Sequence, residues 1–168
     1  NRGRLSACDR YRAGLSRLPE RAARAGVEIC ETRLLDPGRE AEALGDLLDA
    51  ADLVLIDAPC SGTGTWRRNP EARWGLTPDR LHRLVALQSR LMSIAEPLVK
   101  AGGHMVYAVC SLLDEEGPDQ AMKFLTAHPG WVAAALLPGT GEQRGGGVRL
   151  SPTVSKTDGF FIAGLSKP

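Results

Sequence analysis

Apolar residues in this chain follow two patterns that alternate along the sequence. Short, nearly continuous apolar runs are typical of buried strands, and longer segments with apolar residues three or four positions apart are typical of helices. The short runs predict strands at residues 4–8, 27–32, 52–57, 104–109, 131–136 and 159–165. The longer segments predict helices at residues 11–25, 39–50 and 118–128, and one more between Thr77 and Gly102.

The predicted helix that follows Thr77 has the clearest signals. Thr77 can cap its first turn, and Pro78 fits the first helical position, where no N–H is needed. Gly102 and Gly103 are expected to end it. Its apolar residues fall at helical spacing on one face, at Leu81, Leu84, Leu87, Leu91, Ile94 and Leu98.

Strands that alternate with helices predict an α/β fold, in which a parallel sheet carries helices on both faces. In such sheets ligands bind at the carboxyl ends of the strands. Asp9, Asp57 and Cys110 each follow the apolar part of a predicted strand. We therefore expect these three residues to lie along one edge of the sheet.

The composition is ordinary for a globular protein and excludes several classes. The 168 residues are enough for one domain with a hydrophobic core, which we expect to span residues 1–168. No apolar run is long enough to cross a bilayer, and the polar start has no signal-peptide pattern, so a cytoplasmic protein is expected. The Cys and His residues lack the spacing of metal ligands, so no metal is expected.

The net charge of +1 does not by itself indicate a nucleic-acid binder, but basic residues gather in two places. The first 33 residues carry eight Arg against four acids, and the cluster Trp66-Arg67-Arg68 is followed by Arg73-Trp74. Basic and aromatic side chains together can hold phosphates and stack on bases. The alternative is a solvated surface with two Trp side chains packed under a loop.

Two of the four cysteines occupy positions suited to chemistry. Cys8 and Cys30 lie inside strand-like runs and are expected to be core thiols, whereas Cys60 and Cys110 each follow such a run. A Cys at a strand end near a helix start is accessible and can have a lowered pKa. Either residue alone fits an unreactive loop position. Together with Asp57 and Gly-rich backbone on one edge, they predict a nucleophilic site.

The segments that carry these residues resemble the Sun-type (NOP/Sun) RNA 5-methylcytosine methyltransferases. Residues 57–64 have the sequence DAPCSGTG, which is similar to motif IV of that family. Residues 107–111, YAVCS, with Glu115 and Glu116 look like motif VI, and residues 158–161, DGFF, match the closing strand. The resemblance covers nearly the whole chain. It implies a Rossmann-like fold of the class I methyltransferases that use S-adenosyl-L-methionine.

The resemblance also implies a mechanism. The thiolate of Cys110 would add to carbon 6 of cytosine, which makes carbon 5 nucleophilic enough to take a methyl group from S-adenosyl-L-methionine. Asp57 would hold the exocyclic amine and ring nitrogen 3, and Cys60 would be needed to release the product. Because the base must leave its stack, the substrate is expected to be RNA with an unpaired or flipped nucleotide, and ribosomal RNA is the family's commonest substrate.

Matching positions imply further binding residues. Asp9 ends the strand whose terminal acid binds the ribose hydroxyls of the cofactor, and Asp57 is also expected to contact the cofactor. Asp36 is a candidate for the acid near the adenine, although a turn residue before Pro37 is an equally good interpretation.

The RNA is expected to meet three residues in and after motif IV. These are Pro59, Arg67 and Arg68. Arginines on an exposed loop are also common as solvated residues without a partner, which is the alternative for Arg67 and Arg68.

The main departure from the family is the lack of a G-x-G loop after a strand near the N-terminus, where motif I would lie. We therefore expect the first strand of the fold to be missing, so that strands 4–8 and 52–57 pair directly, leave a gap or borrow a strand. This piece alone is expected to be inactive. A smaller departure is Val109, where the family usually has Thr.

Two other functions are compatible with parts of the sequence. A non-catalytic RNA-binding or scaffold remnant would keep the fold without motif I. An unrelated cysteine hydrolase would need a His base near Cys110, but His104 lies at the wrong end of its strand and His82 and His128 lie on predicted helices.

Overall fold

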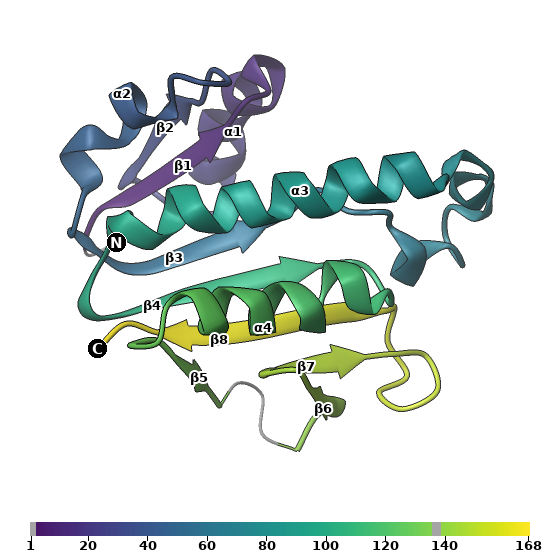
Figure 1. Ribbon diagram of the computed structural model, residues 1–168. Helices are drawn as coiled ribbons and strands as arrows, with labels where there is room; N and C mark the ends of the chain where they lie inside the picture. Colours follow the sequence, from purple (N-terminus) through teal and green to yellow (C-terminus); the bar gives the residue numbers. More distant parts are fainter. Residues whose placement is uncertain (1–2, 136–138) are drawn as a thin grey trace. The chain divides into compact units, whose positions relative to one another are not determined.

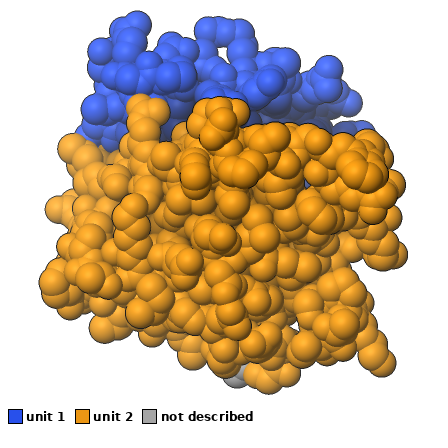
Figure 2. All heavy atoms as spheres, turned by 45° about the vertical axis from the view of Figure 1, so that its right-hand side comes forward, with its two compact units in different colours: residues 1–46 blue, residues 47–168 orange. Residues whose placement is uncertain are grey.

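The computed structural model describes residues 3–135 and 139–168. The chain divides into two compact units, residues 1–46 and 47–168, which Figure 2 colours separately. Each unit is described by itself. None of the helices in the described ranges has the length and apolarity needed to span a membrane.

The smaller unit is a strand–helix–strand segment. Strands β1 (Leu5–Asp9) and β2 (Cys30–Leu34) pair in parallel through α1 (Arg12–Arg24), and the short helix α2 (Glu40–Leu44) follows them. Gly26, with a φ of +69°, lies just past the end of α1, as predicted. Strand β2 begins three residues later than predicted, and Gly45 begins a 3₁₀ turn where we predicted that the helix continues to residue 50.

The larger unit is a mixed sheet with two helices on one face (Figure 1). The strand order is β3-β4-β8-β7-β6, and β5 also pairs with β8. The helices are α3 (Pro78–Ala95) and α4 (Pro118–Ala127). The strands are β3 (Ala51–Asp57), β4 (Val99–Val109), β5 (Val132–Ala134), β6 (Glu142–Arg144), β7 (Gly147–Leu150) and β8 (Phe160–Ser166).

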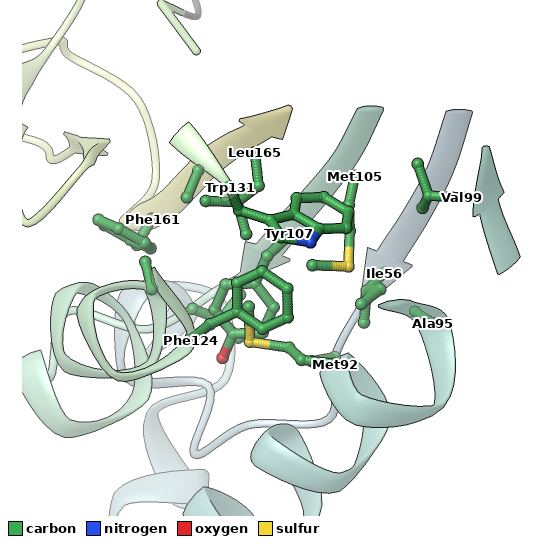
Figure 3. Packing of buried hydrophobic residues seen from close by; sticks show 14 residues of the cluster. Ile56, Met92, Ala95, Val99, Met105, Tyr107, Phe124, Trp131, Phe161 and Leu165 are labelled. Carbon is green, nitrogen blue, oxygen red and sulfur yellow. The ribbon is translucent and has the colours of Figure 1, made fainter. Parts of the chain in front are cut away.

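The core of the larger unit lies between this sheet and its helices (Figure 3). Tyr107 and Phe161, on neighbouring strands, are fully buried, and Met92 of α3 packs in the same cluster. Trp131 meets the ring of Phe124 edge-on, with 5.2 Å between the ring centroids. The core therefore fixes β4, and with it the residue that follows the strand.

Helix α3 begins as predicted but ends earlier. The hydroxyl of Thr77 accepts a hydrogen bond from the N–H of Arg80 at 3.2 Å, which confirms the cap. The helix ends at Ala95, because Pro97 cannot continue the backbone hydrogen-bond pattern. The predicted end at Gly102 and Gly103 is wrong. Both residues lie within β4, where the pairing with β3 shifts register and a side chain on Gly103 would lie 2.9 Å from the carbonyl of Lys100.

The predicted parallel sheet is correct for two strand pairs and wrong for the C-terminal strands. β1 pairs in parallel with β2, and β3 with β4, but β8 is antiparallel to β4. The hairpin of β6 and β7 was not predicted. Its turn contains Gly145 and Gly146, both with positive φ. The predicted strand 131–136 is β5, and Leu136 lies outside the described residues.

The expectation that strands 4–8 and 52–57 pair directly is wrong for the described residues, and the other two alternatives stay predictions. Strands β1 and β3 lie in separate sheets and do not pair, and β3 forms an edge of its sheet in the described part of the chain. On β3, Ile56 is buried, whereas Leu53 and Leu55, which alternate with it, are 58% and 66% exposed.

Candidate active site

The loops that follow β3 and β4 come together at one edge of the larger sheet. The two strands are parallel, and Asp57 is in register with Ala108, so the segments that follow β3 and β4 leave the sheet side by side (Figure 1). The N–H of Ala58 still donates to the carbonyl of Ala108 at 3.0 Å. The carboxyl-end positions predicted for Asp57 and Cys110 are confirmed for these strands.

The three segments that resemble family motifs meet at two glycines. The N–H of Gly64 donates to the carbonyl of Cys110 at 3.1 Å, and the N–H of Gly159 donates to the carbonyl of Gly64 at 2.8 Å. A side-chain carbon on Gly64 would lie only 2.0 Å from the carbonyl oxygen of Gly159. The absence of a side chain therefore allows the segments to approach, and glycine is required at position 64.

The two thiols predicted to act together are in contact. The Sγ atoms of Cys60 and Cys110 lie 3.3 Å apart, and both residues are half-buried. A hydrogen bond from Cys60 lowers the pKa of Cys110 to about 7, against the opposing effects of burial and of the charges on Asp57 and Glu116. The same hydrogen bond, together with burial, raises the pKa of Cys60. A substantial fraction of the protein therefore carries a thiolate on Cys110 and a proton on Cys60 near neutral pH.

Hydroxyl groups join the two loops next to the thiols. The Oγ atoms of Ser61 and Ser111 lie 3.3 Å apart, and Thr63 Oγ1 lies 3.1 Å from Ser111 Oγ. Thr63 Oγ1 also accepts a hydrogen bond from the N–H of Leu112 at 2.9 Å. These contacts fix the relative positions of the residues that follow each cysteine.

Two buried residues that our sequence interpretation did not select lie beneath the loop of Cys60. Gln88 of α3 donates to the carbonyl of Pro59 at 2.9 Å, and Glu116 accepts a hydrogen bond from the N–H of Ser61 at 2.8 Å. Gln88 is a polar residue on the apolar face of a predicted helix, and this position could have indicated a buried amide. Glu116 was noted only as one of two acids in a motif.

The arginines predicted to meet RNA are held by an acid from the third motif. Arg67 and Arg68 pair with the two carboxylate oxygens of Asp158, at 3.1 and 2.6 Å. Their side chains remain 74% and 59% exposed, so each guanidinium group is held by Asp158 and is still accessible to solvent. Beyond them, Arg73 stacks 4.5 Å over the ring of Trp74, which is 77% exposed.

Two of the three acids predicted near the cofactor, Asp9 and Asp36, belong to the smaller unit and are described only within it. Asp9 ends β1 and is exposed, and its Oδ1 accepts a hydrogen bond from the N–H of Tyr11 at 2.9 Å. Asp36 lines a shallow hollow with Leu34 and Arg39. Their placement beside Cys110 stays a prediction.

No cluster of three or more His, Cys, Asp or Glu side chains with metal-site geometry occurs within residues 3–135 and 139–168.

Comparison with known proteins agrees with this geometry. The sequence profile described as 16S rRNA methyltransferase RsmB/F matches residues 1–166. A probable ribosomal RNA small subunit methyltransferase B from Synechocystis sp. is 34% identical over 99% of the chain, and a ribosomal RNA small subunit methyltransferase B from Pectobacterium carotovorum is 44% identical over 69%. The chain spans 38% and 26% of the lengths of these two relatives.

A solved structure extends the similarity to three dimensions. NSun6 from Pyrococcus horikoshii with SFG matches 99% of this chain with a TM-score of 0.78 and 26% sequence identity, and 42% of that protein is covered. The predicted Rossmann-like α/β fold is confirmed by this match, although the larger unit carries α3 and α4 on one face of its sheet and not helices on both faces as predicted.

Proposed function

This chain belongs to the 16S rRNA methyltransferase RsmB/F family, and from that premise we propose that residues 1–168 form the catalytic domain of an RNA cytosine-5 methyltransferase. The proposed reaction transfers a methyl group from S-adenosyl-L-methionine to carbon 5 of a cytosine, with small-subunit ribosomal RNA as substrate. The observation that carries the proposal is the contact of two thiols, 3.3 Å apart, at a sheet edge that also holds Asp57.

The first step proposed is addition of the Cys110 thiolate to carbon 6 of cytosine. A bond forms between Sγ and carbon 6, the electron pair of the 5,6 double bond shifts to the bond between carbons 4 and 5, and the carbon 4–nitrogen 3 pair moves onto nitrogen 3, which takes a proton from solvent. Carbon 5 thereby becomes the nucleophilic carbon of an enamine. Asp57 stabilises this adduct by hydrogen bonds to the exocyclic amine and to ring nitrogen 3. The lowered pKa of Cys110 supports the assignment, because a substantial fraction is thiolate at neutral pH.

In the last step proposed, which releases the product, Cys60, after losing its own proton to solvent, takes the proton from carbon 5. The electron pair of that C–H bond re-forms the 5,6 double bond, and the bond from carbon 6 to Sγ breaks with its pair on sulfur, so that Cys110 leaves as a thiolate. Cys60 is the thiol next to the adduct, since its Sγ contacts that of Cys110. Its raised pKa has the hydrogen bond to Cys110 as main cause, and that cause disappears once Cys110 is bonded to carbon 6. Cys60 therefore becomes a better proton carrier after addition than before it.

The acids of the smaller unit suit the nucleoside part of the cofactor. When bound, S-adenosyl-L-methionine supplies an electrophilic methyl group on a sulfonium. Asp9 is exposed at a strand end, and within the described residues no group donates a hydrogen bond to its Oδ2, so this oxygen can accept one from a ribose hydroxyl. Asp36, beside a hollow, would lie near the adenine. Asp57, the last residue of β3, is the third acid proposed to contact the cofactor.

The RNA would be held by residues in and after the loop of Cys60. Pro59 is exposed next to Cys60 in the sequence. The guanidinium groups of Arg67 and Arg68 are held by Asp158 and remain accessible to solvent. Guanidinium groups bind phosphate oxygens through paired hydrogen bonds, which suits the backbone of a single-stranded segment.

A trapping assay tests the proposal. RNA containing 5-fluorocytosine cannot lose a proton from carbon 5, so the covalent complex persists after methyl transfer. The assay uses the full-length protein, because the chain spans only 38% of the Synechocystis relative. We expect a denaturation-resistant complex with the unmodified protein and with Cys60→Ala, and none with Cys110→Ala.

The matched control is Cys30→Ala, which removes a thiol from β2 and should leave the complex unchanged. A complex that persists in Cys110→Ala refutes the nucleophile assignment. Absence of any complex, with the unmodified protein folded and supplied with S-adenosyl-L-methionine, favours a non-catalytic RNA-binding or scaffold protein instead.

A further inference from the structure

The backbone on both sides of Cys60 is tied to one buried pair of side chains. On one side, the carbonyl of Pro59 accepts a hydrogen bond from Gln88 Nε2 at 2.9 Å. On the other side, the N–H of Ser61 donates to Glu116 Oε1 at 2.8 Å. Gln88 Nε2 also donates to the same Glu116 oxygen, at 3.1 Å. The pair therefore closes a bridge beneath Cys60.

The pair is built into the core. Gln88 and Glu116 are both fully buried, and Ser61 Oγ donates to Glu116 Oε2 at 2.5 Å. The hydroxyl of Tyr107 donates to the backbone carbonyl of Glu116 at 2.5 Å, which anchors the turn that carries it. Burying a carboxylate and an amide is unfavourable unless they are hydrogen-bonded, so the bonds of Gln88 Nε2 and of both Glu116 oxygens favour one arrangement, while Gln88 Oε1 has no hydrogen-bond partner among the described residues.

Cys110 is held by different groups. It follows the last residue of β4, and its carbonyl accepts a hydrogen bond from the N–H of Gly64. The hydrogen bonds of Gln88 and Glu116 go to the Cys60 loop and to each other, and none goes to the backbone of Cys110 in the described structure. The Gln88–Glu116 pair therefore bonds directly to the backbone beside Cys60, and it reaches the Cys110 side only indirectly, through the contact of Ser61 with Ser111.

We propose that Gln88 and Glu116 are positioning residues that hold Cys60 for the release step. The inference rests on the proposed function, because it assigns Cys60 that step. Removing the Gln88–Glu116 bridge frees the peptide groups on both sides of Cys60, whereas Cys110 keeps its place at the end of β4. A small displacement of a reacting group is enough to slow a step by one to two orders of magnitude.

The test is Gln88→Met, which keeps the length of the side chain and removes its donors. With ordinary cytosine RNA and S-adenosyl-L-methionine, we expect turnover to fall by roughly ten- to a hundredfold and the covalent complex to accumulate, as in Cys60→Ala. Trapping with 5-fluorocytosine RNA should be unchanged, because it needs only Cys110. A residue with a merely structural role would reduce trapping and turnover together.

The matched control is Gln120→Met. Gln120 is another buried glutamine, and it donates to the carbonyls of Val85 in α3 and Glu115 in the turn after β4, whereas none of its hydrogen bonds in the described structure goes to the Cys60 loop. Its loss should not cause accumulation of the covalent complex. Glu116→Gln keeps an oxygen that can accept from Ser61 and should retain most of the turnover.

The outcomes separate this inference from the proposed function. If Cys60→Ala itself accumulates no complex, the proposed role of Cys60 fails. If Cys60→Ala accumulates the complex but Gln88→Met does not, the positioning role is refuted. Should Gln88→Met fail to fold, Gln88→Asn replaces it, since the shorter side chain cannot reach both partners. If both unfold while Gln120→Met stays folded, the pair serves the fold and the inference is wrong.

Discussion

The two compact units of the chain are stabilised by different interactions. In residues 1–46, Arg33 and Arg4 both pair with Glu31 and Asp46, and Leu44 is the one buried apolar side chain among the described residues. In residues 47–168, a large apolar cluster fills the space between the sheet and its helices. Partly exposed ion pairs contribute little to stability, whereas each large buried side chain contributes several kcal/mol.

The cysteines show the same difference at the level of chemistry. Cys8 lies in the smaller unit and is exposed, so the prediction that it is a core thiol is wrong, although partial desolvation raises its pKa. Cys110 lies at the end of a core strand of the larger unit, where a neighbouring thiol lowers its pKa. The activated thiol therefore lies in the unit with the large apolar cluster, where the packing of β3 and β4 places a second thiol within 3.3 Å of it.

The largest expected effect comes from removing a core side chain of the larger unit. Phe161 is fully buried, and its ring lies so close to Gly117 and Gly147 that a side-chain carbon on either would be within 2.8 Å of it. Phe161→Ala should lower the free energy of unfolding by about 3–5 kcal/mol. Urea unfolding followed by Trp fluorescence measures this, because all three Trp residues lie in this unit.

The matched change is Leu55→Ala on β3, where the side chain is 66% exposed. It should alter the free energy of unfolding by no more than about 0.5 kcal/mol. Equal losses for the two variants would contradict the view that the apolar cluster, rather than the sheet surface, stabilises this unit.

Local signals made part of the fold predictable, and the rest depended on contacts distant in sequence. The cap at Thr77 and the strand ends at Asp57 and Cys110 follow from nearby residues, and all were predicted correctly. The end of α3 was not, because Gly102 and Gly103 are required by a bulge against β3, and Pro97 ends the helix first. The antiparallel direction of β8 depends on pairing with β4, which no local pattern specifies.

The candidate site was predictable to a similar extent. Cys60 and Cys110 were expected to act together, since parallel strands end at the same edge. Gln88 occupies a position on the apolar face of its helix, so the sequence could have indicated a buried amide, but its partner at Pro59 is known only from the fold. Glu115 and Glu116 are adjacent, yet Glu115 is exposed and Glu116 is buried. The 3₁₀ turn that contains both residues determines which of the two carboxylates is buried, and the sequence alone does not show this.

An intermediate effect is expected in the reactivity of Cys110. Its pKa of about 7 means that alkylation by iodoacetamide should rise with pH through neutrality and fall by about tenfold per pH unit below it. Cys60→Ala removes the main cause of the lowered pKa, so the midpoint should move upward, toward the range of an ordinary thiol. Mass spectrometry of the Cys110 and Cys8 peptides measures both rates in one sample. An unchanged midpoint in Cys60→Ala would show that the thiol contact does not activate Cys110.

The smallest effect is expected from the ion pairs of the smaller unit. Hydrogen bonds from Arg33 and Arg4 hold the pKa of Asp46 well below its usual range, so the folded state binds its proton more weakly than the unfolded state does. The resulting stability is present above the pKa of the unfolded carboxyl and is lost as pH falls through the folded value. Hydrogen exchange of the β1 and β2 amides should therefore accelerate slightly in Asp46→Asn at pH 7, and less so at high salt, because these side chains are exposed enough to be screened. An acceleration as large as that caused by Phe161→Ala in the β4 and β8 amides would mean that charge pairs, and not apolar burial, set the stability of the smaller unit.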